Sequence, residues 1–103
     1  MLDLEWSPDA VDDLDSIWDF IAEDSPDAAD SFIERLREQA RELCRIPQKG
    51  NPIPEMKDDS FRELFYKGYT LVYEITPTGI IIHEAFNQRQ VFIRSYPRNL
   101  RRN

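Results

Sequence analysis

The chain has 103 residues, of which 41% are hydrophobic, and a formal net charge of −7 at pH 7. This length is enough for one domain with a real core, and it excludes a core combined with an elaborate active-site cleft. No apolar run approaches the roughly 18 residues that a membrane span needs, and the acidic opening lacks the basic start of a signal peptide, so we expect a cytoplasmic protein without a membrane partner.

The first elements that we expect are a short strand and two helices. Leu2, Leu4 and Trp6 alternate with acidic residues, which is a strand pattern. The signal Ser-Pro-Asp then starts a helix at 7–9 and again at 25–27, because a hydroxyl caps the helix, proline fits its first position and an acid suits its positive end. Only four residues separate the helices, so they form a hairpin with Val11 and Trp18 at its rim. The inward positions recur at helical spacing: Ala10, Leu14, Ile17 and Ile21 in the first helix, and Ala29, Phe32, Ile33, Leu36, Ala40 and Leu43 in the second.

A loop and three strands follow the hairpin. Residues 47–60 hold three of the seven prolines and no periodicity, so they form a loop that either holds a ligand or merely bridges helix and sheet. The runs 61–66, 69–75 and 80–86 are rich in β-branched and aromatic residues and are separated by turn signals at 67–68 and 76–79. The lone Cys44 lies on the apolar side of the second helix, where we expect a buried thiol rather than a nucleophile.

These elements predict an α+β domain with the order β-α-α-β-β-β. In it the helical hairpin packs on one face of a small antiparallel sheet, and the other face is uncovered. In the strand 69–75, the side chains of Tyr69, Leu71, Tyr73 and Ile75 share one face. Two interpretations of that apolar face stay open: it lies under the helices, or it contributes to a groove for a partner.

Charge is unevenly distributed along the chain. Residues 1–34 contain twelve acidic residues and no Lys or Arg, whereas residues 89–103 contain five arginines and no acid. This gradient fits either a solvated acidic helix with a disordered tail or a surface that steers a charged partner. We expect a domain over residues 1–90 and a basic C-terminal tail over residues 91–103.

A family resemblance rests on residues spread along the chain in order and spacing: Ser7-Pro8, Ala10, Asp13-Leu14, Ile17, Ser25-Pro26, Ala28-Ala29, Phe32, Leu43, Pro47, Gly50, Glu55, Arg62-Glu63, Tyr69, Val72-Tyr73-Glu74 and Arg89. With this pattern the chain from Leu2 to about Gln90 resembles the RelE/ParE superfamily of toxins from bacterial type II toxin-antitoxin modules, nearest to the ParE branch. The resemblance implies a plasmid-stabilisation type of toxin that inhibits DNA gyrase by binding. It also implies a hetero-oligomer with a cognate antitoxin that carries a ribbon-helix-helix DNA-binding domain.

Two departures from the family pattern bear on chemistry. Thr70 replaces a usual arginine, and Asn87 begins the segment where the pattern is commonly His-x-Arg. Asn87 cannot act as a base, and we expect His83, inside a strand, to be a packed or edge residue rather than a general base. Tyr96 is a candidate substitute acid. We therefore expect no catalytic residue, no metal and no cofactor, with two alternatives: a ribosome-dependent mRNA endonuclease of the RelE type, or a non-toxic module that only binds its partner.

Two groups of residues are the candidate contacts. Arg62 and Arg89 match the family pattern at strand ends, and with Arg94 of the tail they are expected to contact the target. Arg62 fits equally well an ion pair with a nearby acid such as Glu63 or Glu84. The antitoxin is expected to bind the apolar groove beside the first helix, through Val11, Trp18, Tyr69, Leu71 and Tyr73.

Overall fold

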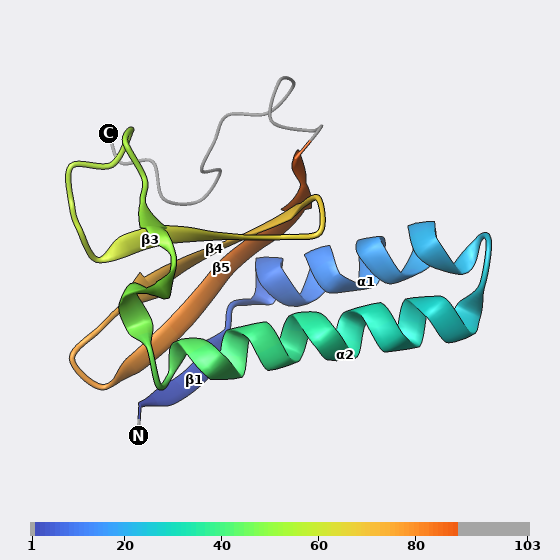
Figure 1. The fold of residues 1–103 in the computed structure, drawn as a ribbon, viewed down its shortest axis with the longest axis horizontal. Coiled ribbons are helices and arrows are strands. Elements are labelled where there is room, and N and C mark those ends of the chain that lie inside the picture. The colour runs from blue at the N-terminus through green and yellow to red at the C-terminus, as the bar shows by residue number, and fades with distance from the viewer. Residues whose placement is uncertain (1, 89–103) are drawn as a thin grey trace.

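The computed structural model describes residues 2–88, and Figure 1 shows a helical hairpin packed against a twisted sheet. This confirms the predicted α+β class and the order β-α-α-β-β-β, with a two-residue strand added inside the expected loop. No helix within residues 2–88 is long and apolar enough to cross a membrane. The elements are β1 (Asp3–Trp6), α1 (Pro8–Ala22), α2 (Pro26–Leu43), the 3-10 turn η1 (Pro47–Lys49), β2 (Asn51–Pro52), β3 (Phe61–Tyr66), β4 (Tyr69–Ile75) and β5 (Gly79–Asn87).

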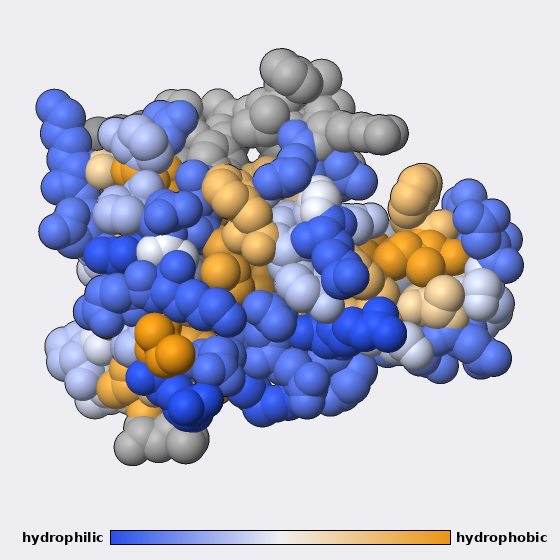
Figure 2. All heavy atoms as spheres, in the orientation of Figure 1, coloured by the Kyte–Doolittle hydropathy of each residue, from blue (hydrophilic) through white to orange (hydrophobic). Residues whose placement is uncertain are grey.

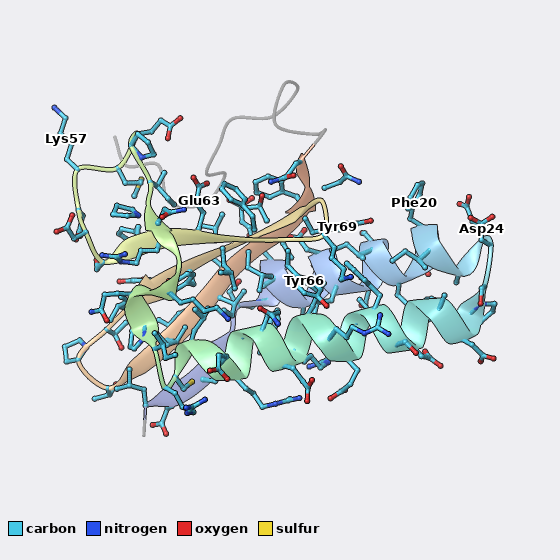
Figure 3. The ribbon with its side chains drawn as sticks, in the orientation of Figure 1. Phe20, Asp24, Lys57, Glu63, Tyr66 and Tyr69 are labelled. Atoms are coloured by element: carbon cyan, nitrogen blue, oxygen red, sulfur yellow. The ribbon has the colours of Figure 1, made fainter. Side chains whose placement is uncertain are left out.

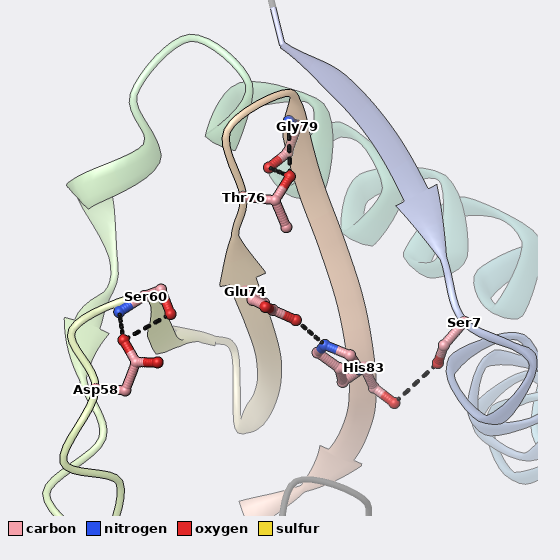
Figure 4. A network of polar contacts seen from close by, with 7 residues as sticks. All are labelled: Ser7, Asp58, Ser60, Glu74, Thr76, Gly79 and His83. Atoms are coloured by element: carbon pink, nitrogen blue, oxygen red, sulfur yellow. Dashed lines mark hydrogen bonds and ion pairs between the residues drawn. The ribbon is translucent and has the colours of Figure 1, made fainter.

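The predicted caps and turns are confirmed. The hydroxyls of Ser7 and Ser25 accept hydrogen bonds of 3.1 Å from the backbone amides three residues later, which satisfies the free N–H groups at the start of each helix. Lys67 and Gly68 have φ values of 48° and 84°, as the tight turn between β3 and β4 requires. The Thr76 hydroxyl accepts a 3.0 Å bond from the amide of Gly79 and closes the next turn (Figure 4).

The sheet is mixed, with the strand order β1-β5-β4-β3-β2. All neighbouring pairs are antiparallel except β1 and β5, which run parallel with Asp3 beside Gly79. This parallel pair is the departure from the expected sheet, and it arises because helices rather than a tight turn follow β1, so no hairpin sets its direction. A Cβ at Gly79 would lie 2.4 Å from the Asp3 carbonyl oxygen, so glycine permits the close approach of the two strands.

The hairpin covers one face of the sheet and forms the main core there. The predicted inward positions are buried or packed against this core, which confirms the helical phases. The apolar face of β4 lies under the helices, where the side chains of Leu71 and Tyr73 are 1% and 0% exposed. Of the two interpretations left open by the sequence, the structure therefore supports the first.

The opposite face of the sheet is partly covered by the proline-rich loop, which corrects the expectation of an uncovered face. Ile53 from this loop packs with Val72 and Phe86 in a second apolar cluster, and Met56 and Phe61 border it. A β-bulge in β5 contributes to this face. Tyr73 pairs with position 82 and Val72 with position 84, so the residue between them on β5 has no pairing partner on β4. Beyond the bulge, the even-numbered residues of β5 face away from the helices.

Candidate functional site

Two apolar side chains on α1 lie at the surface where the sequence predicts a rim. Val11 is 45% exposed, and Trp18 lies seven residues further on, which places the two on the same side of the helix. The indole N–H of Trp18 donates a 2.8 Å hydrogen bond to Oδ1 of Asp30 on α2. This bond holds the ring across the junction of the two helices, so its partly exposed face is presented in one orientation.

Phe20 is a further exposed apolar residue of α1 that is not part of the predicted rim. It lies about 200° around the helix from Trp18, so it belongs to the other flank of the exposed side. Its side chain is 64% exposed, and Figure 3 shows its ring pointing away from α2. Apolar side chains gather at this far end of the hairpin in Figure 2, beside strongly hydrophilic ones. The available signal was an aromatic residue outside the core stripe, next to Asp19. Solvent-exposed aromatic residues with acidic neighbours are suited to contact a basic, partly apolar partner.

α1 is fixed to the sheet by polar contacts beyond the end of β1. The amide of Ser7 donates to the carbonyl of Ile82 at 2.9 Å, and its hydroxyl donates to the carbonyl of His83 at 3.2 Å (Figure 4). Further along α1, Oδ2 of Asp13 accepts a 3.0 Å bond from the amide of Ala85. These contacts continue along β5 where the parallel strand stops, so the exposed side of α1 has a defined position relative to the sheet.

The three predicted contact residues on β4 do not belong to this surface. Leu71 and Tyr73 are core residues, and Tyr69 is nearly buried, with its ring 5.0 Å from that of Phe32 on α2. These side chains lie beneath the helices, so a partner that binds the folded chain does not reach them. The structure therefore gives these side chains a packing role and leaves the exposed residues of α1 as the candidate contacts.

Arg62 is held by the loop that follows α2. Its Nη1 donates to the carbonyl of Gly50 at 2.9 Å, and its Nε donates to the carbonyl of Asp59 at 3.2 Å. The same loop is fixed by Tyr73, whose hydroxyl donates to the carbonyl of Pro47 at 2.6 Å and accepts from the amide of Gly50 at 2.9 Å. Burial raises the pKa of the Tyr73 hydroxyl, with smaller opposing effects from the Gly50 amide and the Arg62 charge. These contacts assign Arg62 a loop-anchoring role.

A shallow groove of about 330 Å³ lies on the sheet face that the helices leave free. Phe65, which is 51% exposed, forms part of its wall. Glutamates and aromatic residues line the described part of the groove, which does not suit a phosphate group, because phosphate is held by Lys and Arg. The lining residues are Pro54, Glu55, Glu63, Phe65, Thr70, Phe86 and Gln88.

His83 is the bulged residue of β5 and lies on the same sheet face. Its Nε2 is 2.9 Å from Oε1 of Glu74 (Figure 4). Its ring centroid is 6.0 Å from that of Phe61. Both side chains of the His83–Glu74 pair are mostly buried. This geometry confirms the expectation of a packed histidine within a strand.

Other reactive groups are placed as follows. The thiol of Cys44 is buried, as predicted. Burial raises its pKa, with a smaller contribution from the Asp3 carboxylate, so the thiol stays protonated at neutral pH.

Among residues 2–88, no group of three or more metal-binding side chains comes together. The predicted contacts Arg89 and Arg94 and the candidate acid Tyr96 lie outside the described residues.

Comparison with known proteins identifies the family. Residues 4–92 match the family model described as the ParE toxin of the type II toxin-antitoxin system parDE. The chain belongs to the ParE toxin family. It is thus a toxin of the ParE/RelE fold from a type II toxin-antitoxin system, as the resemblance in the sequence implied. No curated protein matches the sequence.

Solved structures share the fold of this ParE-family chain at low sequence identity. A structure of the chromosomal ParDE system of P. aeruginosa is 22% identical, with a TM-score of 0.70 over 84% of this chain and 96% of that one. The RelBE2 toxin-antitoxin complex of Mycobacterium tuberculosis is 19% identical, with a TM-score of 0.62 over the same shares. The E. coli DinJ-YafQ complex is 14% identical, with a TM-score of 0.63 over 89% of this chain and 99% of that one.

Proposed function

We propose that this ParE-family toxin acts in the cytoplasm by binding DNA gyrase and is neutralised by a cognate antitoxin with a ribbon-helix-helix domain. The family match over residues 4–92 is the observation that carries the proposal. The charge of the described surface adds support, since residues 1–34 contain twelve acids and no base and the free sheet face is lined partly by glutamates. Such a surface favours a protein target over a phosphate backbone.

Controlled expression in bacteria tests the target. Induction should stop DNA replication and trigger DNA-damage signalling while bulk mRNA stays intact, and the purified toxin should inhibit supercoiling by gyrase. Primer extension on transcripts after induction provides the opposing readout. Cleavage at ribosomal A-site codons would replace the proposal with a RelE-type endonuclease, whereas an absence of both effects would leave a non-toxic partner-binding module.

We assign the target contact to the arginines that follow β5. Arg89 matches the family pattern and Arg94 adds a second positive charge, whereas Arg62 already bonds to two loop carbonyls. Arg89→Ala should relieve toxicity through weaker gyrase binding, and Arg89→Lys should retain part of it because the charge remains. Arg41→Ala is the matched control, since Arg41 is exposed on α2 in an ion pair with Glu34. Equal relief by both alanine variants would refute the assignment.

The antitoxin is proposed to bind the exposed side of α1. Val11 and Trp18 supply apolar anchors on one flank of this side and Phe20 supplies one on the other, with the exposed Asp12, Asp15 and Asp19 between the two flanks. An antitoxin segment that contacts both flanks through apolar residues and places basic residues over the acids between them fits this surface. Since the attraction is partly electrostatic, association should slow as salt rises, while the apolar contacts keep dissociation slow.

Alanine variants of the purified toxin test the antitoxin surface by calorimetry. Trp18→Ala and Phe20→Ala should each weaken the complex at least about fivefold, because buried aromatic anchors dominate such contacts. Phe65→Ala is the matched control, an exposed phenylalanine on the opposite sheet face, and should leave affinity unchanged. Unchanged affinity in both α1 variants would move the antitoxin elsewhere while leaving the gyrase proposal intact.

A further inference from the structure

The outer edge of β1 is unpaired among residues 2–88. Within this described part of the chain, β1 is an end strand of the sheet and β5 is its only strand neighbour. The amides of Asp3 and Ser7 donate to carbonyls at the β5 side, at 3.1 and 2.9 Å. Because alternate residues of a strand direct their backbone groups to opposite sides, the N–H and C=O groups of Leu4 and Trp6 point away from the sheet. A strand edge of this kind is a template for another strand.

A groove runs beside this edge and is large enough for an extended segment. It has a volume of about 550 Å³, within the range of roughly 300–1,000 Å³ that ligand sites occupy. Leu2 and Leu4 are partly exposed and form its apolar side. The opposite wall is the C-terminal half of α2, where Arg41 pairs with Glu34 and Arg45 with Glu42. The charges of Arg41 and Arg45 are therefore already matched, and Lys49 also lines the groove. Leu2 and Leu4 give the groove a side that accepts apolar side chains.

The other face of β1 is acidic. Asp3 and Glu5 are exposed and alternate with Leu2, Leu4 and Trp6. A strand added beside β1 has its own alternation, so one set of side chains enters the groove and the other lies next to Asp3 and Glu5. Opposite charges across neighbouring strands stabilise pairing and like charges destabilise it. Antiparallel pairing of two copies about Leu4 would place Asp3 beside Glu5 of the second copy, so the acids disfavour self-association.

We propose that the β1 edge is a docking site that takes an extended segment of another protein as a sixth strand. The segment carries apolar residues toward α2 and Lys or Arg beside Asp3 and Glu5. Backbone hydrogen bonds to Leu4 and Trp6 supply the pairing, and the alternation supplies the selectivity. This site uses β1 and α2 and is separate from the exposed side of α1, so it holds whether or not the antitoxin and gyrase proposals do.

Titration of the isotope-labelled full-length chain with short peptides tests the site by NMR. A seven-residue peptide that alternates valine and lysine should shift the amide signals of Leu4 and Trp6 and slow their hydrogen exchange at least tenfold. The amides of Asp3 and Glu5 face β5 and should change little. A peptide with glutamate in place of lysine should bind at least tenfold more weakly, as should the lysine peptide with alternate backbone amides methylated.

Charge exchange on the protein separates local pairing from general attraction. Asp3→Lys with Glu5→Lys should invert the preference, so that the glutamate peptide binds at least tenfold better than the lysine peptide. Asp12→Lys with Asp15→Lys makes the same charge change on exposed α1 positions and should leave the preference unaltered. Equal effects of both double variants, or binding without slowed exchange at Leu4 and Trp6, would overturn the proposal. If the hydrogen exchange of Leu4 and Trp6 already slows without peptide as the protein concentration rises, the edge binds a second copy of the chain and the proposal is wrong.

Discussion

Replacing Tyr73 with phenylalanine tests how the core is connected to the loop after α2. The hydroxyl is the group removed, and it donates to the carbonyl of Pro47 and accepts from the amide of Gly50. The ring remains, so packing between sheet and helices is kept. The variant therefore isolates two hydrogen bonds that end on one fully buried side chain.

The size of the effect follows from what the loop groups lose. The amide of Gly50 is buried and would stay unsatisfied, which costs about 1–3 kcal/mol. The carbonyl of Pro47 is only partly buried, so water can replace its partner and the loss there is about 1 kcal/mol. We expect a total loss of about 2–4 kcal/mol from the free energy of unfolding, which is a large part of the roughly 5–15 kcal/mol typical of a domain.

Urea denaturation followed by tryptophan fluorescence measures this loss. With a slope of about 2 kcal/mol per molar urea, the midpoint of Tyr73→Phe should fall by about 1–2 M. Tyr66→Phe is the matched control, because Tyr66 is a partly exposed residue of the neighbouring strand and its change should stay within about 0.5 kcal/mol. A midpoint for Tyr73→Phe within about 0.3 M of the unmodified chain would refute the role of the hydroxyl.

The same variant carries a pH dependence. Burial raises the pKa of Tyr73 in the folded chain above the value of about 10 that an unfolded chain shows. The folded state then binds more protons above pH 10, so the contribution of Tyr73 is fully present below pH 10 and is lost as pH rises through the folded pKa. The stability difference between the unmodified chain and Tyr73→Phe should be constant from pH 7 to 9 and shrink above pH 10. A stability difference that stays constant from pH 7 to well above pH 10 would contradict the burial of the hydroxyl.

Two further substitutions test the layers of the fold by the same denaturation assay. Leu36→Ala should cost about 2–5 kcal/mol of unfolding free energy, because Leu36 is fully buried between hairpin and sheet. Val11→Ala at the exposed rim should cost less than about 1 kcal/mol. Equal losses would mean that the helical phases are wrong. Gly79→Ala should cost about 1–3 kcal/mol or more of unfolding free energy and loosen β1, because the new Cβ would meet the Asp3 backbone. In Gly68→Ala the new Cβ meets no atom within 4 Å, so the variant should lose only about 1 kcal/mol through its positive φ. The reverse order of the two losses would contradict the β1–β5 register.

Local rules were sufficient to predict the two helices, the four longer strands and the turns between them. The two Ser-Pro-Asp signals start helices because capping and dipole effects act within one turn, and the turn at Lys67 and Gly68 depends only on its own backbone. The parallel direction of β1 could not be predicted in this way, because it depends on which strand becomes its neighbour. The bulge at His83 is likewise a property of the pair of strands, and it decides which residues of β5 face the helices.

The candidate site was predictable in part. The position of Trp18 at the rim follows from helical periodicity, and the structure places it there. The position of Phe20 outside the core stripe was a signal in the sequence, but the extent of its exposure depends on how far the hairpin extends past the sheet. Arg62 was expected at a strand end, either in contact with the target or in an ion pair with a nearby acid. The fold brings the carbonyl of Gly50 to it through a loop with no periodic pattern.

The anchoring of α1 explains how a small domain can present a well-defined recognition surface. β1 pairs with β5 only as far as Trp6 and Ile82, and beyond that point Ser7 and Asp13 bond to the β5 backbone in its place. The helix therefore keeps one position relative to the sheet, and its exposed side needs no rearrangement before a partner binds. Preorganisation of this kind lowers the entropic cost of association. The anchoring also gives the acids of α1 two roles. Asp13 holds the helix to the sheet, and its exposed neighbours stay in solvent, where they attract a basic partner.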